Sequence, residues 1–352
     1  MRKDYLDNLR SLCVLLLFPY HTCMVYNAVE SFFVHYGPLR PFSDFIIFCY
    51  PWFMALMFTL AGVSTRLSLE RRTPRQYVRE RFLKLFIPLV FGILILVPPQ
   101  TYFAERFHNG YTSGYFPQYK LYFQNFTELT GYAGGFTPAH LWFILYLFVF
   151  SLVTLPFFLR TLQKNKAEKR SLNLFSLLMT GVIPIFCAFL LNLSGKSIGE
   201  YLALYILGFY LFSRDDAVAL CKKYRWYLTG AALLCLAVAD WLFHSRSVGL
   251  NVFAFLGLKT IMWISVLAAF GLGAQYLDFS NKATRYLAKS SFPVYVLHQP
   301  ILLCAAFYVL AHVTSPYLQA VIILPISLGT TYLVYEIARR IPLMRFLLGI
   351  KK

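Results

Sequence analysis

Charged side chains are scarce in this chain, and acidic ones most of all. Only 14% of the residues are charged, and Asp and Glu together number 15 in 352 residues. Soluble domains carry about 25% charged residues. A chain this poor in charge and this rich in apolar residues is neither a soluble globular enzyme nor a disordered segment, because it would need lipid as its solvent.

Motifs for metals, disulfides and nucleotides are also missing. The seven cysteines form no C-x-x-C pair and predict no disulfide framework. There is no H-E-x-x-H segment and no Walker A loop. The glycine pair Gly134–Gly135 lacks the strand–helix context of a dinucleotide site. We therefore expect no metal.

Long apolar runs take the place of these motifs, since 59% of the residues are hydrophobic. A membrane-spanning helix needs about 20 mostly apolar residues. Ten segments fit, at 11–30, 45–65, 84–103, 140–159, 173–193, 199–213, 226–243, 250–272, 290–311 and 317–337. The sequence predicts an all-α integral membrane protein, a single domain over 1–352 built as a bundle of about ten transmembrane helices.

The net charge of +18 is explained by membrane topology. With ten spans and the N-terminus inside, 27 of the 33 Lys and Arg residues fall in cytoplasmic segments and five in external loops. Cytoplasmic loops carry such an excess in multi-pass proteins. We expect both termini to be cytoplasmic, the chain to lie in the cytoplasmic (plasma) membrane against its lipid, and no nucleic acid to bind.

The longest external segment is 104–139, which is rich in Tyr, Phe and Gly and poor in charge. Aromatic rings with polar edges suit packing onto sugar faces. They suit equally a loop that folds back onto the bundle or sits at the membrane interface, where Tyr is enriched. The sequence leaves both interpretations open.

Ionisable residues within the spans are costly and are therefore functional candidates. Arg10 and His21 are eleven residues apart, which places them on one face of a helix and about 16.5 Å apart along its axis. Asp7 lies three residues before Arg10, close enough to pair with it. The alternative is an arginine that anchors the topology and a histidine buried in the core.

His298 lies at a depth comparable to that of His21, and two histidines can form a proton-handling site. Pro300 is expected to interrupt its helix. Lys259 lies inside a span, where it could snorkel, bind a carbonyl or pair with Asp240. In the basic cytoplasmic segment, Arg81 and Lys84 are nearest the bundle and could bind a phosphorylated ligand.

The opening YLDNLRSLCVLLLFPYH resembles the start of the acyltransferase-3 family of integral membrane acyltransferases. The family's L-D-x-L-R stretch, followed ten residues later by His, is matched by Leu6, Asp7, Leu9, Arg10 and His21. FTLAGVS at 58–64 resembles its aromatic-x-x-S-G-F segment, with Ala61 in place of Ser.

Three further motifs follow in the family's order. RFLKLFIP at 81–88 resembles its R-x-x-R-x-x-x-P stretch, with Lys84 in place of the second Arg. HLWFILYL at 140–147 resembles its G/H-x-W-F-L segment, and SSFPVYVLHQP at 290–300 its S-x-x-x-Y-x-x-H-x-P segment. The residues after Arg10 resemble most the subgroup that includes glucan succinyltransferases.

The resemblance implies transfer of an acyl group, acetyl or succinyl, from cytosolic acyl-CoA to a hydroxyl of an extracytoplasmic glycan or similar acceptor. We expect His21 to be the base, with Asp7 and Arg10 orienting the first helix, and His298 to be a donor, second base or oxyanion partner. Arg10, Arg81 and Lys84 are expected to bind the CoA phosphates. The remaining candidates are expected to contact substrate: Tyr295, Trp142, His140 and Lys259.

Two other functions remain open. A multi-pass permease for a small polar or anionic solute would suit ten spans with helices interrupted at Pro98–Pro99 and Pro300. Against it stand the absence of a visible repeat and of carboxylates that could couple transport to protons. A lipid- or glycan-binding membrane protein without chemistry would tolerate Gln at both His21 and His298.

Overall fold

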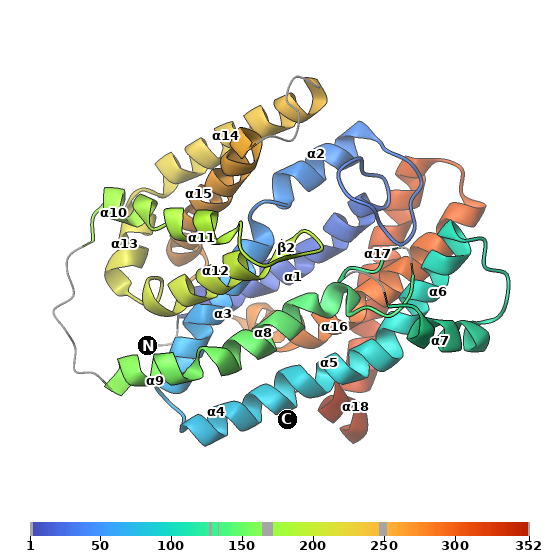
Figure 1. Cartoon of the computed structure of the whole chain (residues 1–352), viewed down its shortest axis with the longest axis horizontal. Helices are drawn as coiled ribbons and strands as arrows, with labels where there is room; N and C mark the ends of the chain where they lie inside the picture. Colours follow the sequence, from blue (N-terminus) through green and yellow to red (C-terminus); the bar gives the residue numbers. More distant parts are fainter. Residues whose placement is uncertain (1–2, 127–128, 133, 164–171, 246–251, 351–352) are drawn as a thin grey trace. The chain divides into compact units, whose positions relative to one another are not determined.

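The computed structural model describes residues 3–126, 129–132, 134–163, 172–245 and 252–350, and the regular structure in these residues is almost entirely helical (Figure 1). The only strands among them are β1 (Asn192–Leu193) and β2 (Lys196–Ser197), paired antiparallel with Asn192 opposite Ser197. The all-α prediction is therefore confirmed for this part of the chain. Contacts divide the chain into two compact units, each assembled from three separate segments. The single-domain description stays a prediction.

The first unit comprises 1–10, 47–79 and 149–284. Its helices are α3 (Phe53–Leu69), α9 (Leu155–Gln163), α10 (Leu174–Met179), α11 (Val182–Cys187), α12 (Ile198–Tyr210), α13 (Asp215–Lys223), α14 (Arg225–Ser245) and α15 (Val252–Tyr276). α3 and α12 pack most closely, because Gly62 and Gly208 let their backbones meet. A β-carbon on Gly62 would lie 2.9 Å from the α-carbon of Gly208, closer than side chains tolerate.

The second unit comprises 11–46, 80–148 and 285–352. It holds α5 (Ile87–Phe91), α6 (Val97–His108), α7 (Tyr115–Gln124), α17 (Pro316–Ala338), α18 (Pro342–Leu347), most of α16 (Lys282–His312), the π-turns η1 (Phe82–Phe86) and η2 (Gly92–Leu96), and the 3-10 turn η3 (Ala139–Leu141). α16 and α17 lie side by side (Figure 1), and Tyr286 donates a 2.9 Å hydrogen bond to Glu336. Five helices contribute to both units: α16, whose first three residues belong to the first unit, and α1 (Asp4–Met24), α2 (Arg40–Cys49), α4 (Pro74–Arg81) and α8 (Trp142–Val153).

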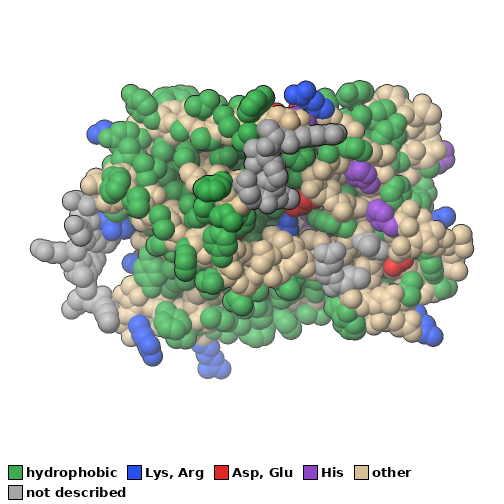
Figure 2. All heavy atoms as spheres, turned by 45° about the horizontal axis from the view of Figure 1, so that its top comes forward, with side chains coloured by type: hydrophobic (Ala, Val, Ile, Leu, Met, Phe, Trp, Pro, Cys, Tyr) green, Lys and Arg blue, Asp and Glu red, His purple; other side chains and the backbone are tan. Residues whose placement is uncertain are grey.

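Long apolar helices make this a multi-pass integral membrane protein. Within the described residues, six helices are long and apolar enough to cross a membrane, and a bent pair, Ala139–Val153 with Leu155–Gln163, would make seven. They run over Arg40–Leu69, Pro74–His108, Arg225–Ser245, Val252–Tyr276, Lys282–His312 and Pro316–Ala338. Hydrophobic side chains cover much of the surface in Figure 2, and Phe253 and Val321 are 83% and 68% exposed.

Each of the ten predicted segments overlaps a helix in the described residues, but three of them fall short of a full span by these measures. The helices at Leu174–Cys187 and Ile198–Tyr210 are shorter, and α1 carries Asp4, Asp7 and Arg10 in its first two turns. Several boundaries also differ. The helical run that was predicted to begin at 84 begins at Pro74, α1 ends at Met24, before the predicted end at 30, and α16 begins at Lys282, before the predicted start at 290. The count of ten and the cytoplasmic termini stay predictions.

The predicted helix break at Pro98–Pro99 is wrong, because Pro74–His108 continues as one helical run. Proline removes the N–H that would bond four residues back. In the π-turn η2, Val97 N–H bonds instead to Gly92, five residues back. Side chains of α7 supply the missing donors: Tyr122 Oη donates to Ile93 O at 2.9 Å, and Tyr119 Oη donates to Leu94 O.

The aromatic segment 104–139 accordingly folds back onto its own unit, apart from residues 127, 128 and 133, which lie outside the described residues. Tyr122 and Gln118 are fully buried, and Gln118 donates to Thr101 at 3.1 Å. Phe116 and Phe126 remain 85% and 79% exposed. The buried side chains of segment 104–139 therefore stabilise the helical run Pro74–His108. Contact of its exposed aromatic side chains with a glycan stays a prediction.

We expect Tyr122→Phe to lower the free energy of unfolding by about 1–3 kcal/mol, the cost of leaving buried carbonyls without a donor. Tyr122 Oη lies 2.9 Å from Ile93 O and 3.2 Å from Thr137 O. Thermal unfolding of the purified protein in detergent measures the loss. Tyr115→Phe on the same helix is the matched control, since Tyr115 Oη has no hydrogen bond among the described contacts, and equal losses in both variants would contradict the prediction.

Candidate active site

α1 carries the two residues singled out first, Arg10 and His21, on one uninterrupted helix from Asp4 to Met24. The eleven-residue spacing therefore places both on the same face, as predicted. Arg10 belongs to the first unit and His21 to the second.

His21 and His298 meet in the second unit. His21 Nδ1 lies 3.0 Å from His298 Nε2, and the two rings stack with centroids 5.0 Å apart. His298 is fully buried, whereas His21 is partly exposed. Phe32 stacks on His21 at 5.8 Å and Phe18 meets His298 edge-on at 5.8 Å, so the pair is framed by apolar rings.

The hydrogen bonds fix which nitrogen of each ring carries its proton. His298 Nδ1 lies 2.6 Å from the carbonyl oxygen of Tyr295, which can only accept, so Nδ1 of His298 carries the hydrogen. Neutral His298 then has a lone pair at Nε2, which must accept from Nδ1–H of His21. This leaves Nε2 of His21 as its basic nitrogen.

His140 and Tyr295 are buried beside this pair. The His140 ring meets the His298 ring edge-on at 5.3 Å. His140 Nε2 lies 3.1 Å from Val296 O, and the hydroxyl of Tyr295 donates to His140 O. Trp142 is 8% exposed and packs against Tyr146 at 5.4 Å. A role for these residues in binding substrate stays a prediction.

The predicted interruption of the helix at Pro300 is wrong, since α16 runs from Lys282 to His312 with Pro293 and Pro300 inside it. The carbonyl that Pro300 leaves without a helical donor is that of Val296, four residues earlier. Nε2–H of His140 donates a hydrogen bond to that carbonyl oxygen, so the helix continues without a buried unpaired acceptor there.

Arg10 is held by two partners in the first unit. Its guanidinium lies 2.9 Å from Asp7 and 2.6 Å from the hydroxyl of Ser64. The pairing with Asp7 was predicted from the spacing, but the contact with Ser64 was missed because 54 residues separate the two. Arg10 stays 30% exposed, so its charge remains open to an anion.

Arg81 and Lys84 share a carboxylate that the sequence interpretation did not weigh. Lys84 pairs with Glu80, and Arg81 lies 3.8 Å from it. Glu80 is the residue directly before Arg81, so its charge was visible in the sequence. It offsets one of the two positive charges, and the pair therefore attracts a phosphate less than two isolated cations would.

Lys259 lies in the first unit, on α15, where the partner is not the Asp240 considered from the sequence. Its ammonium donates to both oxygens of Glu200 on α12, at 2.8 and 2.6 Å. The side chain of Glu200 is 3% exposed and that of Lys259 is 22% exposed, so the ion pair is largely shielded from solvent. A role for Lys259 in binding substrate stays a prediction. Asp240 pairs with His244 at 3.6 Å instead.

Gln100 is a further buried polar residue that was not predicted, because the insertion cost that marks candidates within the spans applies most strongly to ionisable side chains. It is fully buried on α6, and its Nε2 lies 3.4 Å from Nδ1 of His140. The signal was present as an amide directly after Pro98–Pro99 in an otherwise apolar run.

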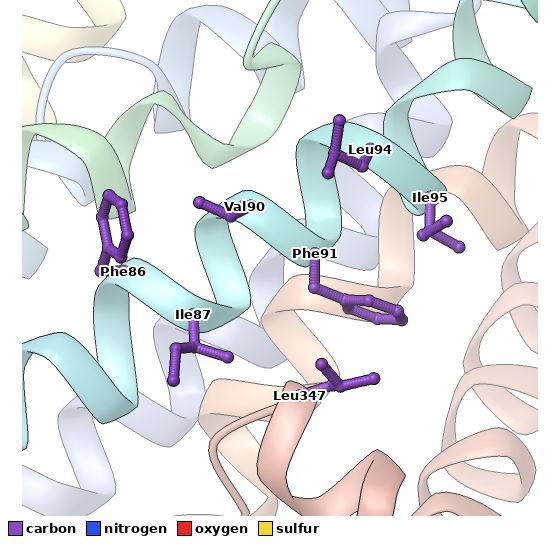
Figure 3. A pocket seen from close by; sticks show the side chains of 7 residues that line it. All are labelled: Phe86, Ile87, Val90, Phe91, Leu94, Ile95 and Leu347. Atoms are coloured by element: carbon purple, nitrogen blue, oxygen red, sulfur yellow. The ribbon is translucent and has the colours of Figure 1, made fainter.

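A groove of about 310 Å³ in the second unit is apolar throughout. Figure 3 shows that six of the lining side chains come from one face of the helical run η1–α5–η2 and that Leu347 of α18 lies on the other side of the groove. The residues are Phe86, Ile87, Val90, Phe91, Leu94, Ile95 and Leu347. None of them can take or give a proton, so the candidate chemistry lies with the histidines.

Known proteins match this chain over nearly its whole length. The family described as an acyltransferase domain matches residues 3–336. Glucans biosynthesis protein C of Shigella dysenteriae is 26% identical over 98% of this chain and 94% of its own length. The proteins of that name from Salmonella schwarzengrund and Escherichia coli O6:K15:H31 are 24% and 26% identical over the same shares. No solved structure is detectably similar.

Proposed function

The chain belongs to the acyltransferase 3 family and is a membrane acyltransferase, and on this premise we propose that it moves an acetyl or succinyl group from cytosolic acyl-CoA to a hydroxyl of an extracytoplasmic glycan. The related proteins are named for glucan biosynthesis, which favours a glucan as the acceptor. We place the enzyme in the cytoplasmic membrane with ten spans and both termini inside.

The observation that supports this chemistry best is the 3.0 Å contact between Nδ1 of His21 and Nε2 of His298. A base that is oriented by a second group, itself fixed by a third, is the arrangement by which enzymes activate hydroxyl nucleophiles. Here His21 is the base, His298 orients it, and the carbonyl of Tyr295 fixes the proton of His298.

In the proposed reaction, a single nitrogen of His21 both takes up and gives back the proton. Nε2 of His21 takes the proton of the acceptor hydroxyl, and the oxygen forms a bond to the thioester carbonyl carbon. The carbon–sulfur bond then breaks, and the thiolate of CoA takes the same proton back from Nε2. The imidazolium formed between these steps is stabilised because His298 accepts a hydrogen bond from Nδ1 of His21.

The donor side is proposed to bind through cations. Arg10 is partly exposed and its guanidinium is oriented by Asp7 and Ser64. Arg81 and Lys84 are the further cations proposed for the CoA phosphates, weakened by Glu80. Family membership makes the enzyme a better account of these features than a permease.

Binding of the donor tests the proposal. A ligand that binds only the folded state stabilises it by about 2.7 kcal/mol at one hundred times its Kd. We expect CoA, acetyl-CoA or succinyl-CoA to raise the thermal midpoint of the purified protein, and Arg10→Ala to remove most of the shift.

Arg66→Ala is the control, since Arg66 forms an ion pair with Glu70 at 2.6 Å in the same unit as Arg10. The rank order of the three ligands assigns the acyl group. A folded protein that no CoA compound stabilises would argue against acyl-CoA as the donor.

A further inference from the structure

Three buried polar side chains beside the histidine pair have no role in the reaction proposed above. His140, Tyr295 and Gln100 are 7%, 5% and 0% exposed, and all belong to the second unit. Polar groups this deep in an apolar bundle are costly to keep. Their contacts show what each of them does.

Pro300 determines the first contact. Because it has no N–H, the carbonyl of Val296 loses the donor that an ordinary helix would provide. Nε2 of His140 lies 3.1 Å from that carbonyl. A carbonyl oxygen can only accept, so neutral His140 must carry its hydrogen on Nε2 and present a lone pair at Nδ1.

Gln100 provides the donor for that lone pair. Its Nε2 lies 3.4 Å from Nδ1 of His140 and 3.1 Å from the carbonyl of Leu96. Both neighbours are acceptors, so the amide cannot be turned around without setting its oxygen against them. Its Oε1 is buried and has no partner among the described residues, which means that only the N–H end of this side chain is used.

Tyr295 closes the connection to the histidine pair. Its hydroxyl donates to the carbonyl of His140, and its own carbonyl accepts from Nδ1 of His298 at 2.6 Å. Directly before His140, Ala139 has a φ of +47°, a conformation rare for any residue but glycine. Backbone strain of this kind persists where surrounding contacts hold it, and it is common beside active sites.

We propose that Gln100, His140 and Tyr295 form a positioning network that locks residues 295–300 of α16 so that His298 keeps Nε2 on His21. The proposal rests on the proposed function, in which His21 is the base. In this proposal the three side chains act through His298, and no contact with the donor or the acceptor is required of them. They act by fixing the proton positions and the helix geometry around His298.

Tyr295→Phe and Gln100→Leu remove one donor each and test the network. Misplacing a catalytic group by about 1 Å can cost about 100-fold in rate, so we expect kcat to fall about 10- to 100-fold. The KM for acyl-CoA should change less than about twofold, because the network does not bind the donor. Release of free CoA from acetyl-CoA and succinyl-CoA, with a glucan oligosaccharide as acceptor, gives both constants.

A spectroscopic measurement distinguishes a network that fixes the proton positions from substitutions that merely loosen the packing around His298. In protein labelled with ¹⁵N-histidine and held in lipid, His140 should be protonated at Nε2 and unprotonated at Nδ1, and Gln100→Leu should shift its Nδ1 signal. A wild-type His140 protonated at Nδ1 instead would overturn the proposal.

Tyr26→Phe is the matched control for Tyr295→Phe. It removes another fully buried hydroxyl of the same unit, one that donates to Gln319 at 3.1 Å, and kcat should not change. Equal losses in both variants would overturn the network. If His21→Gln is inactive while Tyr295→Phe and Gln100→Leu keep the wild-type kcat, the network alone fails. If His21→Gln is fully active, the proposed function itself fails.

Discussion

His21→Gln is expected to lower the rate of acyl transfer by about 10²–10⁴-fold, the usual contribution of a general base. Glutamine preserves the size and polarity of the side chain but has no nitrogen that can take the proton of the acceptor hydroxyl. Its amide can still donate to His298 Nε2, which His21 Nδ1 approaches at 3.0 Å, so the protein should fold. The measurement is release of free CoA in the presence of a glucan oligosaccharide.

His312→Gln is the control for this prediction. His312 lies at the last residue of α16, is exposed and bonds only to the carbonyl of Tyr308 among the described contacts. Its substitution should leave the rate unchanged. If His21→Gln transfers acyl groups at the wild-type rate, His21 is not the base, and a chain that tolerates Gln at both His21 and His298 would have no histidine chemistry.

The second large effect is expected at His298, where two substitutions distinguish the hydrogen bond that orients His21 from the volume that the His298 side chain fills. His298→Leu removes the acceptor for Nδ1–H of His21, so that the proton can move to the nitrogen that should act as base. We expect a loss of about 100-fold or more, because a catalytic histidine in the wrong tautomer is nearly inactive. His298→Gln offers an amide oxygen at about the same distance and should retain more activity than His298→Leu.

The order of these two variants is the result to examine. Orientation by a hydrogen bond predicts that Gln exceeds Leu, measured as kcat in the same CoA-release assay. A role limited to packing predicts the reverse, because His298 is fully buried and Leu is the better apolar filler. A proton passed from His298 to substrate would predict that both variants are equally inactive.

Local sequence patterns correctly predicted those features of the structure that depend on a single helix. Apolar run length predicted where the helices lie, and the eleven-residue spacing placed Arg10 and His21 on one face of α1. The Asp7–Arg10 pair followed from a three-residue separation. Charge counting assigns the net charge of +18 to a ten-span topology, which stays a prediction. The number of spans depends on short helices such as Ile198–Tyr210, which length alone does not decide.

Contacts between distant segments were beyond the reach of such patterns. The depth of His21 and His298 suggested a common site, but 277 residues separate them, and the proton positions depend on a backbone carbonyl. The prolines were the main source of error. Pro98 and Pro300 predict helix breaks, whereas in each case a side chain donates a hydrogen bond to the carbonyl that the proline leaves without a donor, and the helix continues.

The buried Glu200–Lys259 pair has a consequence for how the chain is made. A lysine entering the membrane on a lone helix costs about 2.5–3.5 kcal/mol on insertion scales. The ribosome completes α12, which carries Glu200, before it begins α15, which carries Lys259. The carboxylate is therefore already present when the ammonium emerges, so that the lysine can enter lipid as half of a neutral pair. We therefore expect membrane insertion of α15 to depend on the order of the helices as well as on their hydrophobicity.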